Sequence, residues 1–565
     1  MRSGGHLLAD QLALHGAKLA FCVPGESYLA LLDGLYERRD AIRVVTCRHE
    51  AAAANAAEAY GKLTGRPGVC LVTRGPGSTH AATGVHTAMQ DSTPLVVLVG
   101  QVPRGERGRE GFQELDYEKV FGSMAKWAFQ VDDPDRLPEL VGRAFATATS
   151  GRPGPVVLAL PEDVLSAATE APDASPYQAV VPAPGPAAMA ALRERLARAE
   201  RPVVVLGGGP WDATASGALA RWAVAADLPV AVSFRRQDAV DNRAPCYVGH
   251  LGIGPDPALR ALVEEADLLV AVGTRLTEIE TQGYTLPAPG PRDPARALVH
   301  VHPHAEELGR VYRADLPILA GVGPFAAALA DMAPIDGSRW AERTRAARRA
   351  YEAHLEPALA PGTGVDLAAA AVHLRETLPE DAVVCNGAGN HTQWVNRYYV
   401  YRRPGTQLAP QSGAMGYSVP AALAAKLVHP ERVVLAWSGD GEIQMCGQEL
   451  ATAAQEGLGI VVVVVNNGTL GTIRMHQELR FPRRVMATDL VNPDFVALAR
   501  AYGAHAERIE HAGGFPEALA RALAHAGEHA GPALVELVAD PEALTPRASL
   551  SEIRAEGERA AVSSP

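Results

Sequence analysis

The chain has 565 residues, more than one hydrophobic core accommodates, so its length predicts about three domains. Apolar residues make up 47% and charged residues 21%, a globular composition that excludes a disordered, collagen-like or coiled-coil chain. The formal net charge of -12 is modest for this length and no long run of lysine and arginine is present, which argues against nucleic acid as a partner.

Cysteine usage and the first residues predict a cytoplasmic protein. No two cysteines have the close spacing of a zinc or redox motif, so buried thiols of a reducing compartment are expected. Met1 to His6 lead into an amphipathic segment without the pattern of a signal peptide. Apolar runs such as 94–100 and 460–465 are less than half as long as a membrane-spanning helix, which argues against a membrane. The cysteines are Cys22, Cys47, Cys70, Cys246, Cys385 and Cys446.

Short runs rich in valine and leucine alternate with alanine-rich stretches of helical period along the whole chain. This alternation predicts an α/β fold with three doubly wound parallel-sheet domains. A proline-rich passage at 171–187 and a second break at 357–364 have no periodicity and are expected to be linkers. The expected segments are domains at 1–170, 186–335 and 360–545, and a C-terminal tail at 546–565, either a lid or a mobile end.

In the first third, Glu50 precedes an alanine-rich helical stretch. A glutamate in the first turn of a helix is most often an exposed carboxylate that favours the helix dipole. The residues alone therefore assign no function to Glu50.

In the middle third, the apolar run at 203–206 enters three glycines, Gly207 to Gly209. This is a weak dinucleotide-type loop. It lacks the second glycine spacing and the acidic residue about twenty positions later, so a nicotinamide dehydrogenase is a poor alternative.

In the last third, a predicted buried strand at 432–437 runs directly into Ser438-Gly439-Asp440-Gly441 before a helical stretch. A glycine turn at the start of a helix offers free backbone N–H groups to an anion such as a diphosphate. Asp440 adds a hard carboxylate that suits Mg²⁺.

The next predicted strand, 460–465, ends in Asn466-Asn467-Gly468-Thr469, which supplies further oxygen ligands. Each turn alone is a weak signal, because Asp-Gly and Asn-Gly pairs are common in ordinary turns. Two parallel strands joined by one helix place both turns at the same carboxyl edge of the sheet, where α/β proteins bind ligands. The combination predicts a site for a magnesium-bound diphosphate.

The same turns resemble the signature of the thiamine-diphosphate-dependent enzyme family, because Gly439-Asp440-Gly441 is followed by 24 residues and then Asn466-Asn467. The resemblance extends over almost the entire chain and is closest to the acetolactate-synthase branch. It implies that Asp440, Asn467 and the main-chain carbonyl of Thr469 hold Mg²⁺. It also implies that other residues of the two turns lie beside the cofactor, namely Gly439, Gly441, Glu442, Leu470 and Gly471.

The resemblance gives Glu50 a function, because residues 48–52, 73–77 and 91–94 look like the family's pyrimidine-binding domain. The Glu50 carboxyl would bond N1′ of the aminopyrimidine, so that N4′ can remove the proton from C2 of the thiazolium. Residues 412–416 resemble the segment that bends the cofactor, with Met415 between its two rings and the Gly413 carbonyl accepting from N4′. Asn390 and His391 would contact the diphosphate. The alternatives are that Met415 fills a core and that His391 is structural.

Residues near the expected reacting carbon bear on the reaction. Phe112, Gln113 and Lys126 match the acetolactate-synthase pattern, although an aromatic plug and a surface lysine would also account for Phe112 and Lys126. Glu26 stands where the synthases have a glycine and simple decarboxylases an acidic residue, and His476 replaces a synthase tryptophan. Acetolactate synthesis from 2-oxoacids is the leading assignment, and a 2-oxoacid decarboxylase or a 2-hydroxyacyl-CoA lyase is the alternative.

The resemblance also implies partners and a second cofactor. In the family one subunit supplies the pyrimidine side and another the diphosphate side, so a homodimer or homotetramer with active sites at the subunit interface is expected. The middle domain resembles the flavin-binding domain of the synthases, but Arg275-Leu276-Thr277-Glu278 replaces their Arg-Phe-Asp-Asp. The departure disfavours FAD without excluding it, because related lyases bind ADP there or leave the site empty.

Overall fold

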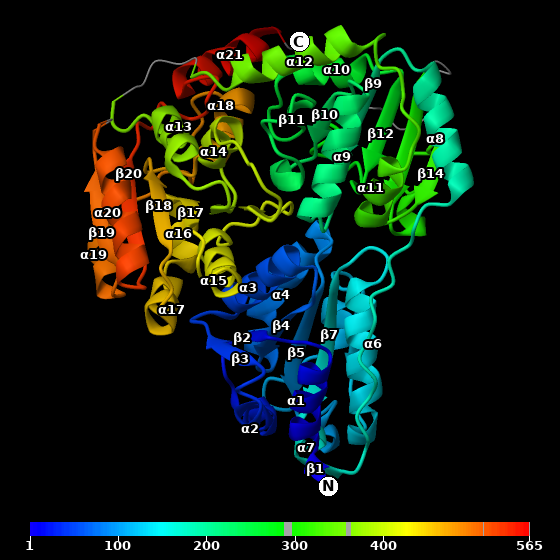
Figure 1. Ribbon diagram of the computed structural model, residues 1–565. Coiled ribbons are helices and arrows are strands. Elements are labelled where there is room, and N and C mark those ends of the chain that lie inside the picture. Colours follow the sequence, from blue (N-terminus) through cyan, green and yellow to red (C-terminus); the bar gives the residue numbers. More distant parts are fainter. Residues whose placement is uncertain (287–295, 358–362, 512, 564–565) are drawn as a thin grey trace.

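A computed structural model describes residues 1–286, 296–357, 363–511 and 513–563. The chain forms three six-stranded sheets, all of them parallel, with helices on both faces (Figure 1). This confirms the α/β class with three doubly wound domains. Within the described ranges, every helix is too short or too polar to cross a membrane.

The first sheet belongs to the N-terminal domain. Helices α1 (Gly4–Leu14), α2 (Leu29–Glu37) and α6 (Leu137–Thr149) cover one face, and α3 (Glu50–Thr64) and α4 (Gly75–Asp91) cover the other. The central strands of this sheet are apolar along their whole length, because both faces of the sheet are buried. In sheet order they are β3 (Arg43–Thr46), β2 (Leu19–Cys22), β4 (Gly68–Val72), β5 (Leu95–Gln101), β7 (Pro155–Pro161) and β6 (Trp127–Gln130).

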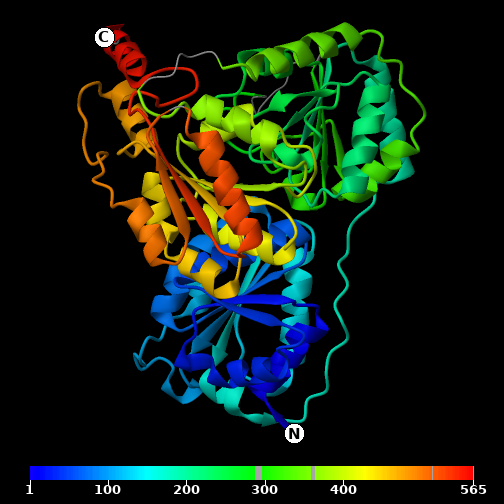
Figure 2. The same cartoon turned by 60° about the vertical axis from the view of Figure 1, so that its left-hand side comes forward.

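The chain from residue 170 to residue 185 contains no helix or strand and runs along the outside of the first domain (Figure 2). It agrees with the first predicted linker. Most of the second predicted break, residues 358–362, lies outside the described residues, and the domain bounds stay predictions. Short elements complete the first domain: β1 (Arg2–Ser3), β8 (Ala168–Thr169), α5 (Tyr117–Phe121) and α7 (Glu162–Ser166).

The central sheet is covered on one face by α8 (Pro186–Arg198), α9 (Ala213–Ala225) and α11 (Val322–Ala330). Helix α10 (Pro257–Glu264) covers the other face, and α12 (Ala341–His354) packs on it. The strands in sheet order are β11 (Tyr247–His250), β10 (Val230–Val232), β9 (Pro202–Leu206), β12 (Leu268–Val272), β13 (Ala297–His302) and β14 (Leu316–Leu319).

Three histidines make the central part of the molecule sensitive to acid. Burial lowers the pKa of His250, His302 and His354 from 6.5 to about 4. Below pH 6.5 the unfolded chain binds protons that the folded chain does not, so stability falls as the pH falls from about 6.5 to about 4. We expect the free energy of unfolding, measured in urea at pH 7.5, 5.5 and 4.5, to decrease steadily.

The matched variants separate this effect from general acid unfolding. His302→Gln should flatten the dependence on pH between 6.5 and 4, and the same change at the exposed His511 should not. An unfolding free energy that is constant from pH 6.5 to 5 would contradict the assignment.

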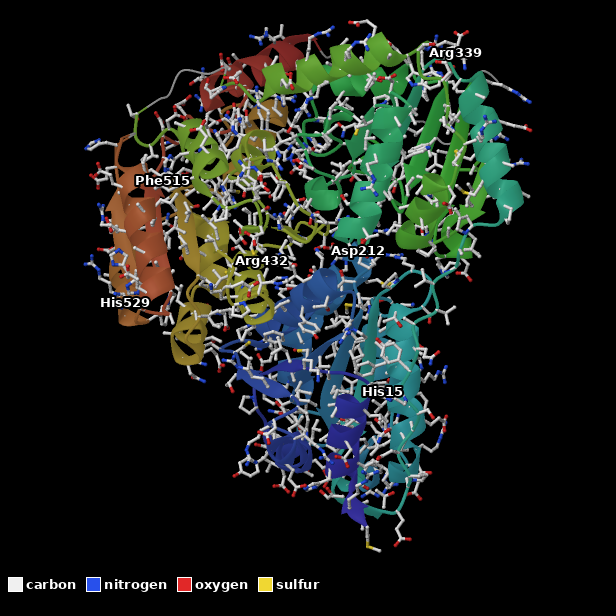
Figure 3. All side chains as sticks on the ribbon, in the orientation of Figure 1. His15, Asp212, Arg339, Arg432, Phe515 and His529 are labelled. Carbon is white, nitrogen blue, oxygen red and sulfur yellow. The ribbon has the colours of Figure 1, made fainter. Side chains whose placement is uncertain are left out.

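The third sheet carries the C-terminal domain. Helices α13 (Leu367–Thr377), α14 (Thr392–Tyr398) and α20 (Phe515–Glu528) cover one face. Phe515, the first residue of α20 (labelled in Figure 3), is buried there. Helices α15 (Ser418–Val428) and α17 (Glu449–Glu456) lie on the other face with α19 (Phe495–Ala501). The strands in sheet order are β16 (Gln407–Leu408), β15 (Val383–Asn386), β17 (Val434–Gly439), β18 (Val461–Asn466), β20 (Ala533–Val538) and β19 (His505–Ile509).

A buried charge network joins the first and third domains where α3 packs on α15. Tyr417 donates to Oε2 of Glu58 at 2.6 Å, and Lys62 pairs with both Glu58 and Asp91. Burial raises the pKa of Glu58, and the Lys62 ammonium opposes that rise. Lys62 also donates to the carbonyl of Ala409 at 3.0 Å, so the network anchors the loop that leads to Met415.

The described part of the C-terminal tail, up to residue 563, is docked. Helix α21 (Leu550–Ser563) packs on α18 (Gly471–Arg480), and Arg554 donates to both carboxylate oxygens of Glu478 at 3.0 and 2.9 Å. Arg554 lowers the pKa of the Glu478 carboxyl to about 2. The tail therefore braces the helix that begins at Gly471, which argues against a mobile end.

Candidate active site

The two turns predicted to hold magnesium lie side by side in the C-terminal domain. Strand β17 ends at Gly439 and α16 (Asp440–Cys446) begins at the next residue. The parallel neighbour β18 leads into Asn467. Oδ2 of Asp440 accepts the N–H of Gly468 at 2.8 Å, so the carboxylate meets the second turn directly. The expected adjacency follows from the parallel register of β17 and β18.

The oxygen atoms of these turns fit a hard cation. Asp440 is only 4% exposed, and burial raises the pKa of its carboxyl. A bound cation would offset this unfavourable burial of charge. The other available donors are the side-chain amide oxygen of Asn467 and the main-chain carbonyl of Thr469. A set of oxygen donors without sulfur or imidazole suits Mg²⁺.

Asn492 belongs to the same site, and the sequence reasoning missed it. Its amide donates to Oδ2 of Asp440 at 2.9 Å and to Oδ1 of Asn466 at 2.8 Å. Asn492 therefore orients the carboxylate from a loop segment that has no motif, so no sequence signal pointed to it.

A cavity of about 250 Å³ opens at these turns. Glycines leave it room, because a Cβ at Gly441 would lie 2.7 Å from the Leu470 side chain. A Cβ at Gly439 would lie 2.7 Å from Nδ1 of His391. Every residue predicted to bind the cofactor lines it except Glu50: Asn390, His391, Gly413, Met415, Gly439, Asp440, Gly441, Glu442, Asn467, Thr469, Leu470 and Gly471.

His391 and Glu442 form a pair at the cavity wall. Nε2 of His391 lies 3.2 Å from Oε2 of Glu442, whose side chain is buried. The N–H of Ser418 donates to the other oxygen of Glu442 at 3.2 Å. A Cβ at Gly387 would lie 1.8 Å from that carboxylate, so only glycine fits there. Within the described part of the chain, Nε2 of His391 and Oε2 of Glu442 are both buried without a hydrogen-bond partner, so the two residues are close neighbours at the cavity wall rather than a hydrogen-bonded pair.

The amide of Asn390 is already engaged by the protein. Its nitrogen donates to the carbonyl of Leu544 at 3.2 Å, and its oxygen accepts from the Thr472 hydroxyl at 3.0 Å. Asn390 therefore fixes the start of α18 and the segment before the tail at the cavity wall.

The catalytic residues predicted in the first domain gather at the carboxyl edge of its sheet. Glu26 follows β2 and is exposed, and Glu50 follows β3 as the first residue of α3. The carbonyl of Gln113 accepts the N–H of Gly75, the first residue of α4, at 2.9 Å. Gln113 has a φ of 64°, a strained value for a residue with a side chain.

Within one chain this edge does not reach the magnesium turns. Neither Glu26, Glu50 nor Gln113 lines the 250 Å³ cavity. Among the residues that the structure describes, no hydrogen bond or ion pair links Glu50 to that cavity. The turn before Glu50 instead contacts α17, where Glu449 accepts the N–H of Arg48 at 2.9 Å.

Phe112 and Lys126 do not fit the structural alternatives of an aromatic plug and a surface lysine, and their match to the synthase pattern stays a prediction. Phe112 is 68% exposed, so it plugs nothing within one chain. The Lys126 amine donates to the carbonyl of Ser150 at 2.7 Å and also to that of Thr147, near the C-terminus of α6. Burial lowers the pKa of Lys126 to about 8. Lys126 is a helix cap rather than a surface lysine.

A larger cavity of about 840 Å³ adjoins the first and is lined by all three domains. The two share wall residues, including Gly389, Asn390 and Thr472. His476 lines this cavity and not the smaller one, together with Arg275 and Glu278 of the central domain. Its cationic lining comprises Arg152, Arg235, Arg275, Arg310, Arg397 and Arg547.

The glycine run of the central domain serves packing. A Cβ at Gly208 would lie 2.2 Å from the carbonyl oxygen of Gly273, and one at Gly207 would lie 2.3 Å from Oγ of Ser233. The glycines are therefore explained by the close approach of neighbouring loops. They give no support to a nicotinamide site.

Comparisons with known proteins agree with this geometry. Three family models match in order along the chain: "Thiamine pyrophosphate enzyme, N-terminal TPP binding domain" at residues 2–120, the "central domain" at 189–329 and the "C-terminal TPP binding domain" at 387–537. The chain belongs to the thiamine pyrophosphate enzyme family, which confirms the resemblance and the class of cofactor.

Curated relatives show which branch of the family the chain resembles. The acetolactate synthase large subunit of Parasynechococcus marenigrum is 34% identical, over 95% of this chain and 87% of the relative. The acetolactate synthase isozyme 2 large subunit of Escherichia coli is 31% identical, over 90% and 91%. A probable acetolactate synthase large subunit of Methanocaldococcus jannaschii is 31% identical, over 96% and 93%. The chain is thus an acetolactate synthase-like, thiamine-diphosphate-dependent enzyme.

Removal of the Asp440 charge tests the metal assignment. Asp440→Asn should weaken Mg²⁺ binding in the presence of thiamine diphosphate by roughly ten- to a hundred-fold, because a neutral amide balances less of the cation's charge. Calorimetric titration of the metal-free protein measures this. Asp489→Asn, at a largely exposed carboxylate in the following loop, is the control. Equal Mg²⁺ affinity in Asp440→Asn and wild type would contradict the assignment.

Proposed function

We propose that the protein is a thiamine-diphosphate- and Mg²⁺-dependent carboligase that decarboxylates pyruvate or a similar 2-oxoacid and transfers the acyl unit to a carbonyl acceptor. The observation that carries the proposal is the convergence of the predicted oxygen donors and cofactor-binding residues on one cavity. When bound, thiamine diphosphate supplies the carbon nucleophile and stores the electron pair released by loss of CO₂.

The residues of the chain then have the task of binding Mg²⁺ and the cofactor and of orienting the cofactor. Asp440, Asn467 and the main-chain carbonyl of Thr469 would hold Mg²⁺. Met415 and the carbonyl of Gly413 would set the conformation of the bound cofactor. Glu50 would hold a proton at N1′ of the aminopyrimidine, a task that requires a carboxyl within hydrogen-bonding reach.

Glu50 comes from a second copy of the chain in this proposal. Several large apolar side chains at the cavity and elsewhere on the C-terminal domain are exposed in the single chain, as are others on the domain that carries Glu50. Exposed apolar surface beside a functional site is typical of a surface that a partner covers. The chain is thus proposed to work as a homodimer or homotetramer with two-fold symmetric interfaces. The exposed residues are Ile473, which lines the cavity, Met445, Met486 and Val491 elsewhere on the C-terminal domain, and Leu29 and Phe112 on the first domain.

One observation favours a 2-oxoacid decarboxylase as the second candidate. The exposed Glu26 carboxyl lies at the same sheet edge as Glu50, where it could protonate the product carbon instead of leaving it to an acceptor. His476, in the wall of the larger cavity, is proposed to influence which acceptor enters.

The arginines that line the larger cavity support a phosphate-bearing ligand there. They suit the phosphates of FAD and of ADP equally well. We infer a cytoplasmic location from the six cysteines, which are all buried free thiols.

The test is a product assay. The protein is supplied with thiamine diphosphate and Mg²⁺ and offered a panel of 2-oxoacids and, in separate reactions, a 2-hydroxyacyl-CoA, and the products are identified by mass spectrometry. We expect CO₂ and a ligated 2-hydroxy-3-oxoacid, acetolactate in the case of pyruvate. Free aldehyde would establish the decarboxylase, and cleavage of a 2-hydroxyacyl-CoA without CO₂ would establish the lyase. Absence of all three products would refute the proposal.

A further inference from the structure

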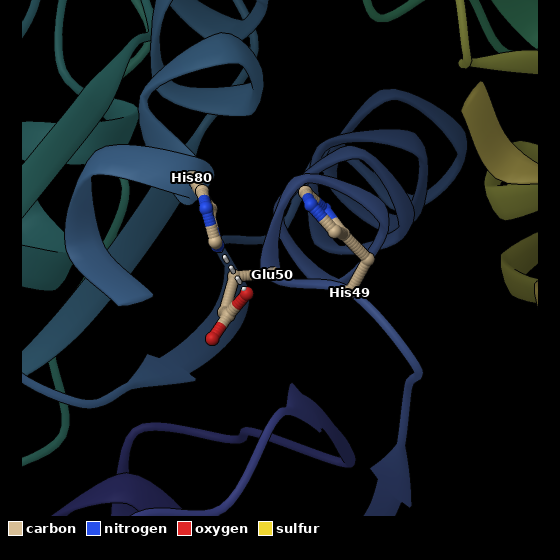
Figure 4. Close-up of side chains that lie close together, drawn as sticks. All are labelled: His49, Glu50 and His80. Carbon is tan, nitrogen blue, oxygen red and sulfur yellow. Dashed lines mark hydrogen bonds and ion pairs between the residues drawn. The ribbon is translucent and has the colours of Figure 1, made fainter. Parts of the chain in front are cut away.

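Glu50 has a partner within its own domain. His80, in the second turn of α4, places Nδ1 2.9 Å from Oε2 of Glu50. The His80 ring also stacks on that of His49, with centroids 4.7 Å apart and planes inclined by 27°. Figure 4 shows the His80 ring joined to the Glu50 carboxylate, with His49 beside them at the start of α3. Gly77 leaves room for the carboxylate, because a Cβ there would lie 3.2 Å from Oε1 of Glu50.

The geometry of this cluster suits a hydrogen bond better than a metal ion. His49 is the N-cap of α3, and its Nδ1 accepts the N–H of Ala51 at 3.1 Å. The lone pair that a metal would need on this atom is therefore engaged. Nδ1 of His80 is likewise engaged, by its contact with Oε2 of Glu50.

We propose that His80 is a positioning residue that holds one oxygen of the Glu50 carboxylate and leaves the other for the aminopyrimidine. The inference rests on the proposed function, in which Glu50 contacts N1′. An ionised carboxylate only accepts hydrogen bonds, so Nδ1 of His80 donates in this pair. In the described part of the chain, Oε2 has this partner and Oε1 accepts no hydrogen bond.

The hydrogen bond matters because it sets the orientation of the Glu50 carboxylate. A glutamate has three side-chain torsions, and the first turn of α3 restrains only its backbone. A charge-assisted hydrogen bond is one of the stronger kinds, and it fixes the plane of the carboxylate. Positioning to within a fraction of an ångström is what proton transfer at N1′ requires.

The experiment compares His80→Ala with His80→Asn. The amide nitrogen of asparagine stands nearly where Nδ1 of histidine stands, so Asn keeps the donor and Ala removes it. Two quantities are measured without substrate. The first is the dissociation constant of thiamine diphosphate in the presence of Mg²⁺, by calorimetry. The second is the rate at which the C2 proton of the bound cofactor exchanges with deuterium, by NMR after acid quenching.

We expect His80→Ala to slow the exchange roughly ten- to a hundred-fold and to change the dissociation constant less than about three-fold. His80→Asn should recover exchange to within about three-fold of wild type. Added imidazole should partly restore the Ala variant, because the 52% exposed side chain leaves an open site. The exposed His511→Ala is the control. A cofactor affinity that falls in step with exchange would overturn the positioning assignment, as would failure of both the Asn variant and imidazole to recover exchange.

The variant Glu50→Gln separates this inference from the proposed function. If Glu50→Gln exchanges the C2 proton as fast as wild type, Glu50 does not act on the cofactor and the proposed function fails. If Glu50→Gln is slow and His80→Ala exchanges at the wild-type rate, the inference about His80 alone is overturned.

Discussion

Glu50→Gln should lower turnover by about a hundred- to ten-thousand-fold and change the affinity for thiamine diphosphate only a few-fold. The amide keeps the size of the side chain but cannot carry the proton that the carboxyl shares with N1′. Steady-state kinetics with pyruvate, together with calorimetric titration of the cofactor, measure both quantities.

The control is Glu37→Gln on α2, where the carboxylate is exposed. It should keep full turnover. If Glu50→Gln and Glu37→Gln turn over at equal rates, Glu50 has no part in the reaction. A large loss of cofactor affinity in Glu50→Gln would instead show that the residue binds the cofactor rather than activating it.

Lys62→Met should destabilise the protein by about 3 to 5 kcal/mol, because it leaves Glu58 and Asp91 buried without their cation. Glu58 and Asp91 are nearly inaccessible to solvent, so water cannot replace the ammonium. Lys62 also holds the carbonyl of Ala409, and the loop towards Met415 should lose order with it. Urea unfolding followed by circular dichroism measures the change in free energy.

The surface pair of Lys119 and Asp116 provides a matched comparison. Lys119 is 85% exposed, so Lys119→Met should cost less than about 1 kcal/mol. A similar small loss for Lys62→Met would mean that the network at the domain interface is not a buried charge cluster in solution.

The fold could be predicted from the sequence because its signals are local. Apolar runs such as 461–465 are buried on both sides, and this alternation with helices specifies parallel sheets without knowledge of the packing. Asp440 and Asn467 were predicted to meet for the same reason, since strand order and the carboxyl edge follow from topology.

Residues that act through tertiary contacts escaped the sequence reasoning. Asn492 lies 52 residues after Asp440 in an irregular segment, and only folding brings the two side chains together. His80 follows a glycine turn that was recognised, but its contact with Glu50 depends on how α3 packs beside α4. Lys126 matched a family pattern, whereas its position under the end of α6 is a packing result.

The glycines at 207–209 show the converse problem. A run of glycines after a strand has the same appearance whether it surrounds a phosphate or lets two backbones approach. The close approach of the Gly273 carbonyl shows that these glycines serve packing, and this tertiary contact leaves no local pattern in the sequence.

The central claim is that one coenzyme is held by two chains. It is tested most directly by co-expressing Glu50→Gln and Asp440→Asn chains with different affinity tags and purifying the mixed dimer through both. Each variant alone should be inactive. In a two-fold symmetric dimer one of the two sites then has both residues intact, so the mixed dimer should have about half of the wild-type activity. A mixed dimer as inactive as its parents would contradict the shared site.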